Sequence, residues 1–348
     1  VLLAVSFPRW GAFPVAWVAL VPLFWAVRDG TPRVAAGRFF LAGWVFHSLV
    51  LQWLTANIFW AGGWATLGSQ LLCIGLSLFW AVLGAVYVWT RRVLPQASCA
   101  ALVALLWVGM EWCQANLFTG FGWCALGYAQ GPDLVLAQLA ALGGVHLISF
   151  VLVWVNALLA LAIVERRWRF PRIVAACVVV GLGHFVGYGL LGLPEYAERP
   201  FRAGILQTNY PQEMKFDYEM PEFMVQHAIK WSRVLAENEH VDCFFWPEAT
   251  VMRHFEDKPC RGYLTGLVKD TGAWFFSGVV RDDRSEGKSY NSSALIAPDG
   301  TAAGYYDKVH LAPFGEYMPF AKFLPFLRQI VPSDVDAGHE QKVFKTDK

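Results

Sequence analysis

The chain has 348 residues, of which 56% are hydrophobic, and its 28 basic and 27 acidic side chains leave a net charge of +1. This apolar content lies outside the range of ordinary soluble domains. Because the charges nearly balance and no basic stripe with interleaved aromatic residues is present outside the membrane loops, nucleic-acid binding is excluded from the expected functions.

Charge divides the chain into two parts. Of the 55 charged residues, 14 precede Pro194 and 41 lie from Pro194 onward, whereas 14 of the 17 Trp lie in the first part. A charged side chain at the bilayer centre costs about 2.5–3.5 kcal/mol on insertion scales, so long uncharged stretches are typical of lipid-facing helices. We therefore predict a helical membrane domain over residues 1–193 and a soluble domain over residues 194–348.

The uncharged stretches of the first part are long enough to cross a bilayer, which needs about 20 apolar residues. We predict spans near Ala12–Val27, Val34–Leu54, Thr66–Trp89, Ala97–Asn116, Ala141–Val164 and Ile173–Leu193. The chain opens in another apolar run, Val1–Phe7, which we interpret as the end of a truncated first span. About seven spans are therefore expected.

The arginines of the short loops predict the orientation, because positive residues are retained on the cytoplasmic side. The loops at 55–65 and 117–140 contain no Lys or Arg. The arginines lie in three other loops, one before, one between and one after these two: Arg28, Arg33 and Arg38, then Arg91 and Arg92, then Arg166, Arg167, Arg169 and Arg172. This alternation predicts that the soluble domain emerges on the face opposite the cytoplasm.

Glu111 lies inside a predicted span, where a carboxylate is a functional candidate by default. The alternative is a carboxylate near the outer interface that is hydrogen-bonded to a neighbouring helix. His47, His146 and His184 are expected to pack or to form interhelical hydrogen bonds, since nothing near them has the spacing of metal ligands. We expect neither a metal nor a cofactor.

From Phe201 onward, short runs rich in strand-forming residues alternate with helical or turn segments, which predicts an α/β domain. Glu219–Glu239 is the expected helix, because apolar residues can form a packed face along it. The expected strands are Arg202–Thr208, Val241–Trp246, Trp274–Arg281, Ser292–Ala297 and Ala302–Tyr306. The turn Ala297-Pro298-Asp299-Gly300 makes the last two strands a hairpin.

Charged residues that follow two of these strands are candidates for catalysis. Glu248 follows Trp246-Pro247, where an apolar neighbourhood can raise a carboxyl pKa toward useful base strength. Spacing alone favours the alternative, an acidic residue in the first turn of a helix. Lys308 follows the hairpin and can offer a positive charge to an oxyanion, although a solvated Lys at a strand end is commoner. Glu316 is either a loop anchor or a supporting carboxylate.

Motifs at these positions resemble the nitrilase superfamily. They are Trp246-Pro247-Glu248, Tyr290-Asn291-Ser292 and Lys308-Val309-His310-Leu311-Ala312-Pro313-Phe314-Gly315-Glu316-Tyr317-Met318-Pro319. Further runs resemble its integral-membrane branch, the apolipoprotein N-acyltransferases: Thr119-Gly120-Phe121-Gly122-Trp123, Gly127-Tyr128-Ala129-Gln130 and Gln207-Thr208-Asn209-Tyr210-Pro211-Gln212. The resemblance covers essentially the whole chain.

The resemblance implies a fold and a set of site residues. The fold is a multi-pass helical membrane domain joined to a nitrilase-like αββα sandwich. The site is a Glu-Lys-Cys triad with Glu248 as general base, Lys308 as stabiliser of the tetrahedral intermediate and Glu316 as a supporting carboxylate. Phe216 stands where the family often has Trp, and it is a candidate for substrate binding.

The Cys nucleophile of the family is not present in residues 1–348. We therefore interpret the chain as truncated before the nucleophile strand and before the family's last span. Cys243 and Cys260 do not match the family position, and a buried thiol is inert because its pKa is not depressed. Whether these two cysteines pair with each other is left open.

The activity implied by the resemblance is phospholipid-to-apolipoprotein N-acyl transfer. An acyl chain would pass from a membrane phospholipid to a Cys thioester and then to the α-amino group of a diacylglyceryl-cysteine, with ping-pong kinetics. We expect a monomer in a bacterial inner membrane with its catalytic domain on the periplasmic side. The alternatives are a membrane-tethered amidase that uses the same triad with water, and a non-catalytic membrane protein that binds or transports.

Overall fold

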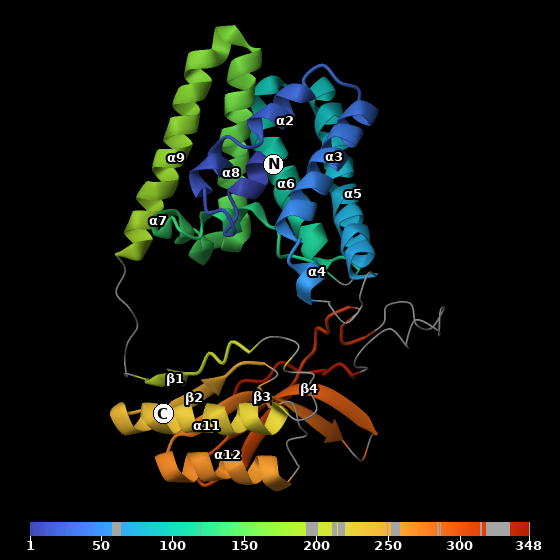
Figure 1. Cartoon of the computed structure of the whole chain (residues 1–348). Coiled ribbons are helices and arrows are strands. Elements are labelled where there is room, and N and C mark those ends of the chain that lie inside the picture. Colours follow the sequence, from blue (N-terminus) through green and yellow to red (C-terminus); the bar gives the residue numbers. More distant parts are fainter. Residues whose placement is uncertain are drawn as a thin grey trace. The chain divides into compact units, whose positions relative to one another are not determined.

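The computed structural model describes residues 1–57, 64–118, 120–192, 201–210, 214, 220–248, 250–251, 258–283, 285, 287–313, 315–317 and 335–347. The chain divides into two compact units, Val1–Glu195 and Tyr196–Lys348. Figure 1 shows that the first unit is helical and that the second combines a sheet with helices.

Long helices make up the body of the first unit. They are α3 (Pro32–Val50), α5 (Trp64–Val93), α6 (Gln96–Asn116), α8 (Ala140–Val164) and α9 (Arg169–Leu191). In the described part of the chain, four helices are long and apolar enough to cross a membrane, at 66–93, 98–116, 140–164 and 166–191. These four coincide with the last four predicted spans, so this unit is a membrane domain.

The segment predicted as the span Ala12–Val27 is not one continuous helix. It forms a 3-10 helix η1 (Phe13–Trp17) and a short α-helix α2 (Val21–Ala26), each with a Pro at its start. A helix of six residues is about 9 Å long, whereas the hydrocarbon core is about 30 Å thick. The run Val1–Phe7 likewise contains only the four-residue helix α1 (Leu2–Val5).

A buried amide from α8 compensates the break between η1 and α2. The Asn156 side chain is fully buried; its Oδ1 accepts a hydrogen bond from the Leu20 N–H at 2.8 Å, and its Nδ2 donates to the Ala16 carbonyl at 2.8 Å. Non-helical backbone at membrane depth is tolerated where other protein groups satisfy its polar atoms. Asn156 therefore permits the interruption that Pro14 and Pro22 impose.

Glu111 of α6 is likewise a structural anchor. Its side chain is 4% exposed, and Oε1 accepts hydrogen bonds from the Trp107 indole at 2.8 Å and from the Leu126 N–H at 2.7 Å. His146 of α8 lies 3.4 Å from Oε2. The carboxylate thus fixes the start of the 3-10 helix η3 (Leu126–Gln130). These contacts match the interpretation of Glu111 as a hydrogen-bonded interhelical carboxylate.

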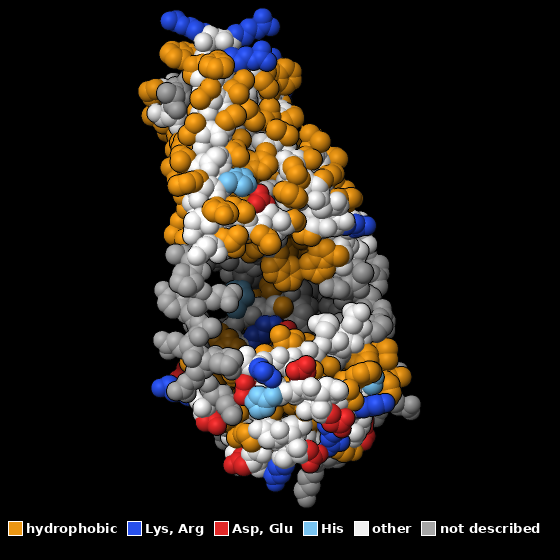
Figure 2. Space-filling view, turned by 90° about the vertical axis from the view of Figure 1, so that its left-hand side faces the viewer, with side chains coloured by type: hydrophobic (Ala, Val, Ile, Leu, Met, Phe, Trp, Pro, Cys, Tyr) orange, Lys and Arg blue, Asp and Glu red, His pale blue; other side chains and the backbone are white. Residues whose placement is uncertain are grey.

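The arginine-bearing segments meet at one end of the membrane unit. The start of α3, the end of α5 and the connection between α8 and α9 lie together there (Figure 1). Figure 2 shows Lys and Arg side chains gathered at the end of an otherwise hydrophobic body. The end of α9 lies at the opposite end, so the chain leaves this unit away from the arginines.

The second unit contains one sheet with strand order β1-β2-β3-β4-β5 in its described residues. The strands are β1 (Ala203–Ile205), β2 (Cys243–Trp246), β3 (Trp274–Asp283), β4 (Lys288–Ile296) and β5 (Ala302–Asp307). The first three strands are parallel and the last three form antiparallel pairs. All five predicted strands and the hairpin are confirmed.

Two helices supply the parallel crossovers and cover one face of the sheet (Figure 1). Helix α11 (Met220–Asn238) confirms the predicted helix, whereas α12 (Lys258–Thr271) was not predicted. Ile229 of α11 and Leu264 of α12 pack with Phe244 and Phe275 from the central strands. Membrane helices joined to an α/β domain confirm the expected fold class. Of the expected sandwich, the described residues contain one sheet and one helical layer.

Candidate active site

Glu248 lies in a turn just beyond the carboxyl end of β2, the second strand of the sheet. The preceding Trp246 is 4% exposed, stacks edge-on with Phe275 and donates its indole N–H to Ser232 of α11 at 3.0 Å. The strand end is therefore rigid, while the Glu248 side chain remains 61% exposed. The first-turn helix interpretation is wrong, because Glu248 belongs to a turn and α12 begins ten residues later at Lys258.

Lys308 directly follows β5, and its main chain is fixed on both sides. Its N–H donates to the Asn291 carbonyl at 2.8 Å, and its own carbonyl accepts from the Gly338 N–H at 2.9 Å. A Cβ added to Gly338 would lie 2.2 Å from the Asp307 carbonyl oxygen, so this approach requires glycine. The extended segment at 335–338 thus holds the start of the Lys308 loop.

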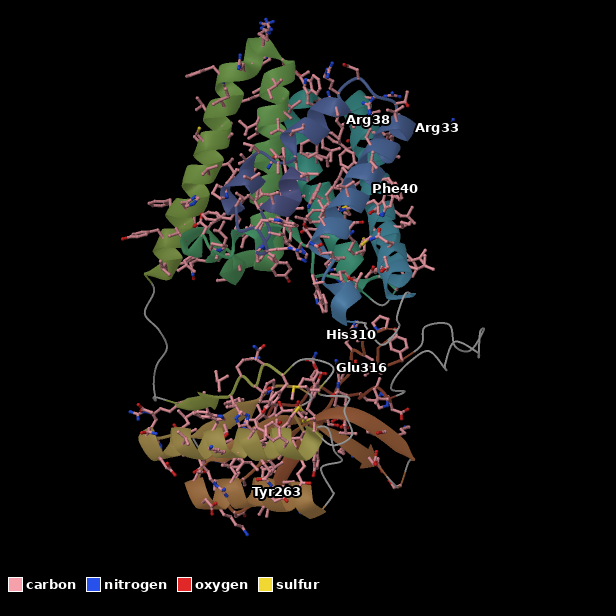
Figure 3. All side chains as sticks on the ribbon, in the orientation of Figure 1. Arg33, Arg38, Phe40, Tyr263, His310 and Glu316 are labelled. Atoms are coloured by element: carbon pink, nitrogen blue, oxygen red, sulfur yellow. The ribbon has the colours of Figure 1, made fainter. Side chains whose placement is uncertain are left out.

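The structure brings Glu248, Lys308 and Glu316 together. The Lys308 Nζ lies 3.2 Å from Glu248 Oε1 and 3.0 Å from Glu316 Oε2. The Glu316 side chain is 14% exposed, and its Oε2 also accepts the Ala312 N–H at 2.6 Å. Glu316 and His310 both lie in the loop that follows β5 (Figure 3). Phe216, the fourth predicted site residue, lies outside the described residues.

Asn291 also belongs to the site, although no separate role was expected for it. It lies in β4, and its Nδ2 donates to Glu248 Oε1 at 2.6 Å and to Glu316 Oε1 at 2.5 Å. An amide nitrogen has two hydrogens, so one Asn can bind both carboxylates without adding charge. Its place in the Tyr290-Asn291-Ser292 motif was the available signal.

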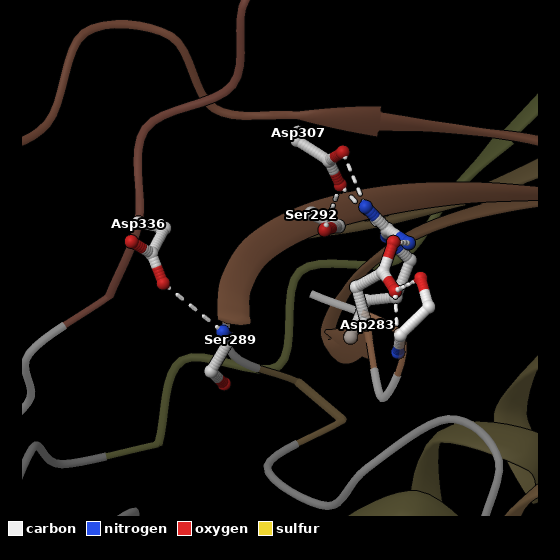
Figure 4. A network of polar contacts seen from close by, with 7 residues as sticks. Asp283, Ser289, Ser292, Asp307 and Asp336 are labelled. Carbon is white, nitrogen blue, oxygen red and sulfur yellow. Dashed lines mark hydrogen bonds and ion pairs between the residues drawn. The ribbon is translucent and has the colours of Figure 1, made fainter. Parts of the chain in front are cut away.

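A second polar network surrounds Asp307, the residue before Lys308 (Figure 4). The Arg281 guanidinium binds the Asp307 carboxylate through two hydrogen bonds, of 2.9 and 2.6 Å, and Ser292 donates to the same carboxylate at 2.6 Å. The guanidinium also stacks on Tyr290, 4.8 Å from its ring centroid. Burial of the Asp307 carboxyl opposes ionisation, but the hydrogen bonds from Arg281 and Ser292 outweigh it and hold its pKa below the ordinary value. This network fixes the residue that precedes Lys308.

The charges of the site keep Lys308 protonated. Partial burial of the amine lowers its pKa, but the hydrogen bond to Glu316 and the charges of Glu248 and Glu316 outweigh burial, so the pKa lies above its ordinary value of 10.5. An ammonium fixed in this way can stabilise developing negative charge on an oxygen. Glu248 is the more exposed of the two carboxylates.

Cys243 does not join this group. It is 3% exposed within β2 and has a free thiol. Burial, with a further contribution from the Asp242 charge, raises the pKa of the Cys243 thiol to about 12. At neutral pH this cysteine is therefore a thiol and a poor nucleophile. Nothing is described of the Cys260 side chain.

A metal centre is not indicated where the structure is described, because no group of three or more His, Cys, Asp or Glu is arranged to hold an ion there. The chemistry available to the described site is that of a carboxylate base, a fixed ammonium and a second carboxylate. Fold and site together define a class of protein: a polytopic membrane chain whose α/β domain presents a Lys between two Glu beside its strand ends.

Known proteins share extensive sequence with the chain. Residues 1–158 match the family described as apolipoprotein N-acyltransferase N-terminal domain. The apolipoprotein N-acyltransferase of Geobacter metallireducens is 33% identical over 95% of this chain and 66% of its own length. That of Vibrio cholerae is 27% identical over 93% of this chain and 65% of its own length. A solved carbon-nitrogen hydrolase from Helicobacter pylori aligns with 32% of this chain and 40% of its own, at 17% identity and a TM-score of 0.26, a likeness too limited to support an inference.

The chain belongs to the apolipoprotein N-acyltransferase family. It spans about two thirds of the length of the curated relatives that it matches.

Proposed function

We propose that the protein is a phospholipid-to-apolipoprotein N-acyltransferase. The observation that carries the proposal is the position of Lys308, whose ammonium lies between Glu248 and Glu316 beside the strand ends of a domain joined to membrane helices. The names of the relatives state the same activity for those proteins. A catalytic domain joined to membrane helices also suits an enzyme whose two substrates both carry lipid.

In the proposed mechanism, Glu248 accepts the proton of a Cys thiol, and the thiolate attacks the ester carbonyl of a membrane phospholipid. The nucleophile is the Cys that the family resemblance implies, and no residue of 1–348 matches its position. Lys308 stabilises the tetrahedral oxyanion, and the lysophospholipid leaves as an alcohol with the proton that Glu248 carried. The α-amino group of a diacylglyceryl apolipoprotein then attacks the thioester, and the thiol is regenerated.

The proposed location is a bacterial inner membrane, with the α/β domain on the periplasmic side. Support comes from the arginine-bearing segments at one end of the membrane unit and from α9, which begins at that end with Arg169 and ends at the other with Leu191. Positive residues are retained in the cytoplasm. We propose that the enzyme acts as a monomer.

Mass spectrometry of lipoproteins tests the activity. When the protein is depleted, we expect lipoproteins with a free α-amino group on the diacylglyceryl-cysteine, and re-expression of the gene should restore the third acyl chain. An unchanged acylation state would instead favour the amidase, which uses the same triad with water as the acceptor.

A further inference from the structure

Arginines from three elements converge on one short segment at the arginine-rich end of the membrane unit. Arg28 donates to the Trp25 carbonyl at 3.3 Å, Arg92 at the end of α5 donates to the Gly30 carbonyl at 3.3 Å, and Arg38 of α3 donates to the Ala26 carbonyl. The Arg28 guanidinium also stacks on the Trp25 ring, 4.2 Å from its centroid. Three cationic groups are therefore held around the end of α2.

This cluster is not neutralised by carboxylates within the described residues. Asp29 pairs with Arg28 at 2.9 Å, and Glu165 pairs with Arg172; neither Arg38 nor Arg92 has a carboxylate partner in that part of the chain. A guanidinium has five N–H donors in a planar fork that matches phosphate oxygens. Since Arg38 and Arg92 each use one donor on a backbone carbonyl, donors remain for an anion.

The helix surface beside the cluster is open and apolar. A Cβ added to Gly37 would meet nothing within 4 Å, so the surface of α3 is open at this position next to Arg38; we call this missing side chain the notch. Exposed apolar side chains continue along the same face at helical spacing, namely Val34, Leu41 and Trp44. A free phosphate ion would gain nothing from apolar contacts with this stripe, whereas a lipid acyl chain would pack along it.

We propose that Arg28, Arg38 and Arg92, with the notch at Gly37, bind the headgroup of an anionic phospholipid whose acyl chain lies along the exposed face of α3. The site is at the end of the membrane unit opposite to the end of α9. This site goes beyond the proposed function, because a lipid held there would be a bound partner of the membrane domain and not the acyl donor at the Glu248 and Lys308 site. Figure 3 shows Arg38 and Arg33 at this end of the unit.

Native mass spectrometry of the full chain in detergent with added phosphatidylglycerol tests the site. The double variant Arg38→Gln with Arg92→Gln should weaken phosphatidylglycerol binding about 30-fold, equivalent to about 2 kcal/mol for two guanidiniums near a membrane surface. The matched control, Arg166→Gln with Arg167→Gln, removes the same charge from the connection before α9 and should weaken binding less than about threefold. Binding of phosphatidylcholine should be unchanged in all variants.

The variant Gly37→Leu tests the same site without changing any charge or introducing a clash. It tests the proposal by itself if the double variant fails to elute as a single species. Filling the notch should weaken phosphatidylglycerol binding about fivefold or more. If both double variants weakened phosphatidylglycerol binding equally, the binding would depend only on general surface charge, and the proposal would be overturned. Unchanged binding by Gly37→Leu, or displacement of the lipid by millimolar inorganic phosphate, would overturn it as well.

Discussion

At the scale of single residues, the site depends on how two carboxylates are held near one another. Glu248 and Glu316 repel, and Lys308 supplies one positive charge between them. Asn291 adds two donors but no charge, so the pair retains the net negative charge that a general base requires. We therefore propose Asn291 as a positioning residue for Glu248, acting through its hydrogen bonds and its neutrality.

Substitution of Asn291 separates these two contributions. Asn291→Leu removes both hydrogen bonds; the loss of the charge-assisted bond to Glu248 alone is worth about 1.5–3 kcal/mol, so acyl-enzyme formation should slow about 10- to 100-fold. Asn291→Asp keeps the shape but places a third carboxylate between the other two, and we expect a larger loss that becomes smaller as the pH falls. Rate–pH profiles of both variants measure this, and a flat profile for Asn291→Asp would contradict the electrostatic role.

The site residues were accessible to sequence reasoning to different degrees. Glu248 and Lys308 are 60 residues apart, and only the family motifs, not local spacing, indicated that they meet. Spacing alone favoured a helical turn for Glu248, because Pro followed by an acidic residue is typical of a helix start. The contacts of Asn291 could not be predicted, because they depend on the register between β4 and the loop after β5.

At the scale of elements, the strands followed from the sequence better than the helices. The β-rich runs are short, apolar and bounded by turn residues, so their positions were clear. Helix α12 contains Gly262, Gly266 and only a few apolar residues, including the buried Leu264 and Leu267, so its periodicity is weak. Ala12–Val27 was predicted as a span from composition, although Pro14 and Pro22 already indicated a break.

The broken segment predicts a strong dependence on Asn156. Asn156→Leu would leave the buried Leu20 N–H and Ala16 carbonyl without partners, at about 1–3 kcal/mol for each group. We expect a clear decrease in the thermal unfolding midpoint of the chain in detergent. The matched variant Asn116→Leu loses one exposed bond to the Trp112 carbonyl and should change the midpoint little. Equal decreases for the two variants would contradict the role of Asn156.

At the scale of the whole molecule, the division between the units relates fold to activity. The membrane unit carries buried polar anchors such as Glu111 and Asn156, which hold irregular segments between helices. The α/β unit carries the Glu248, Lys308 and Glu316 group. Segregation of charge along the sequence was enough to predict this division, because lipid and water select opposite compositions. The interruptions within the helical unit depend on single side chains, and composition does not reveal them.

The central claim is that Glu248 generates the nucleophile for acyl transfer. Its most direct test incubates the full-length protein with phospholipid and follows the hydroxylamine-sensitive thioester by mass spectrometry. Glu248→Gln should slow thioester formation about 10²- to 10⁴-fold, as expected for loss of a general base. Glu222→Gln, which changes an exposed carboxylate bonded to Tyr263, should leave the rate unchanged. Thioester formation at the wild-type rate in Glu248→Gln would contradict the account.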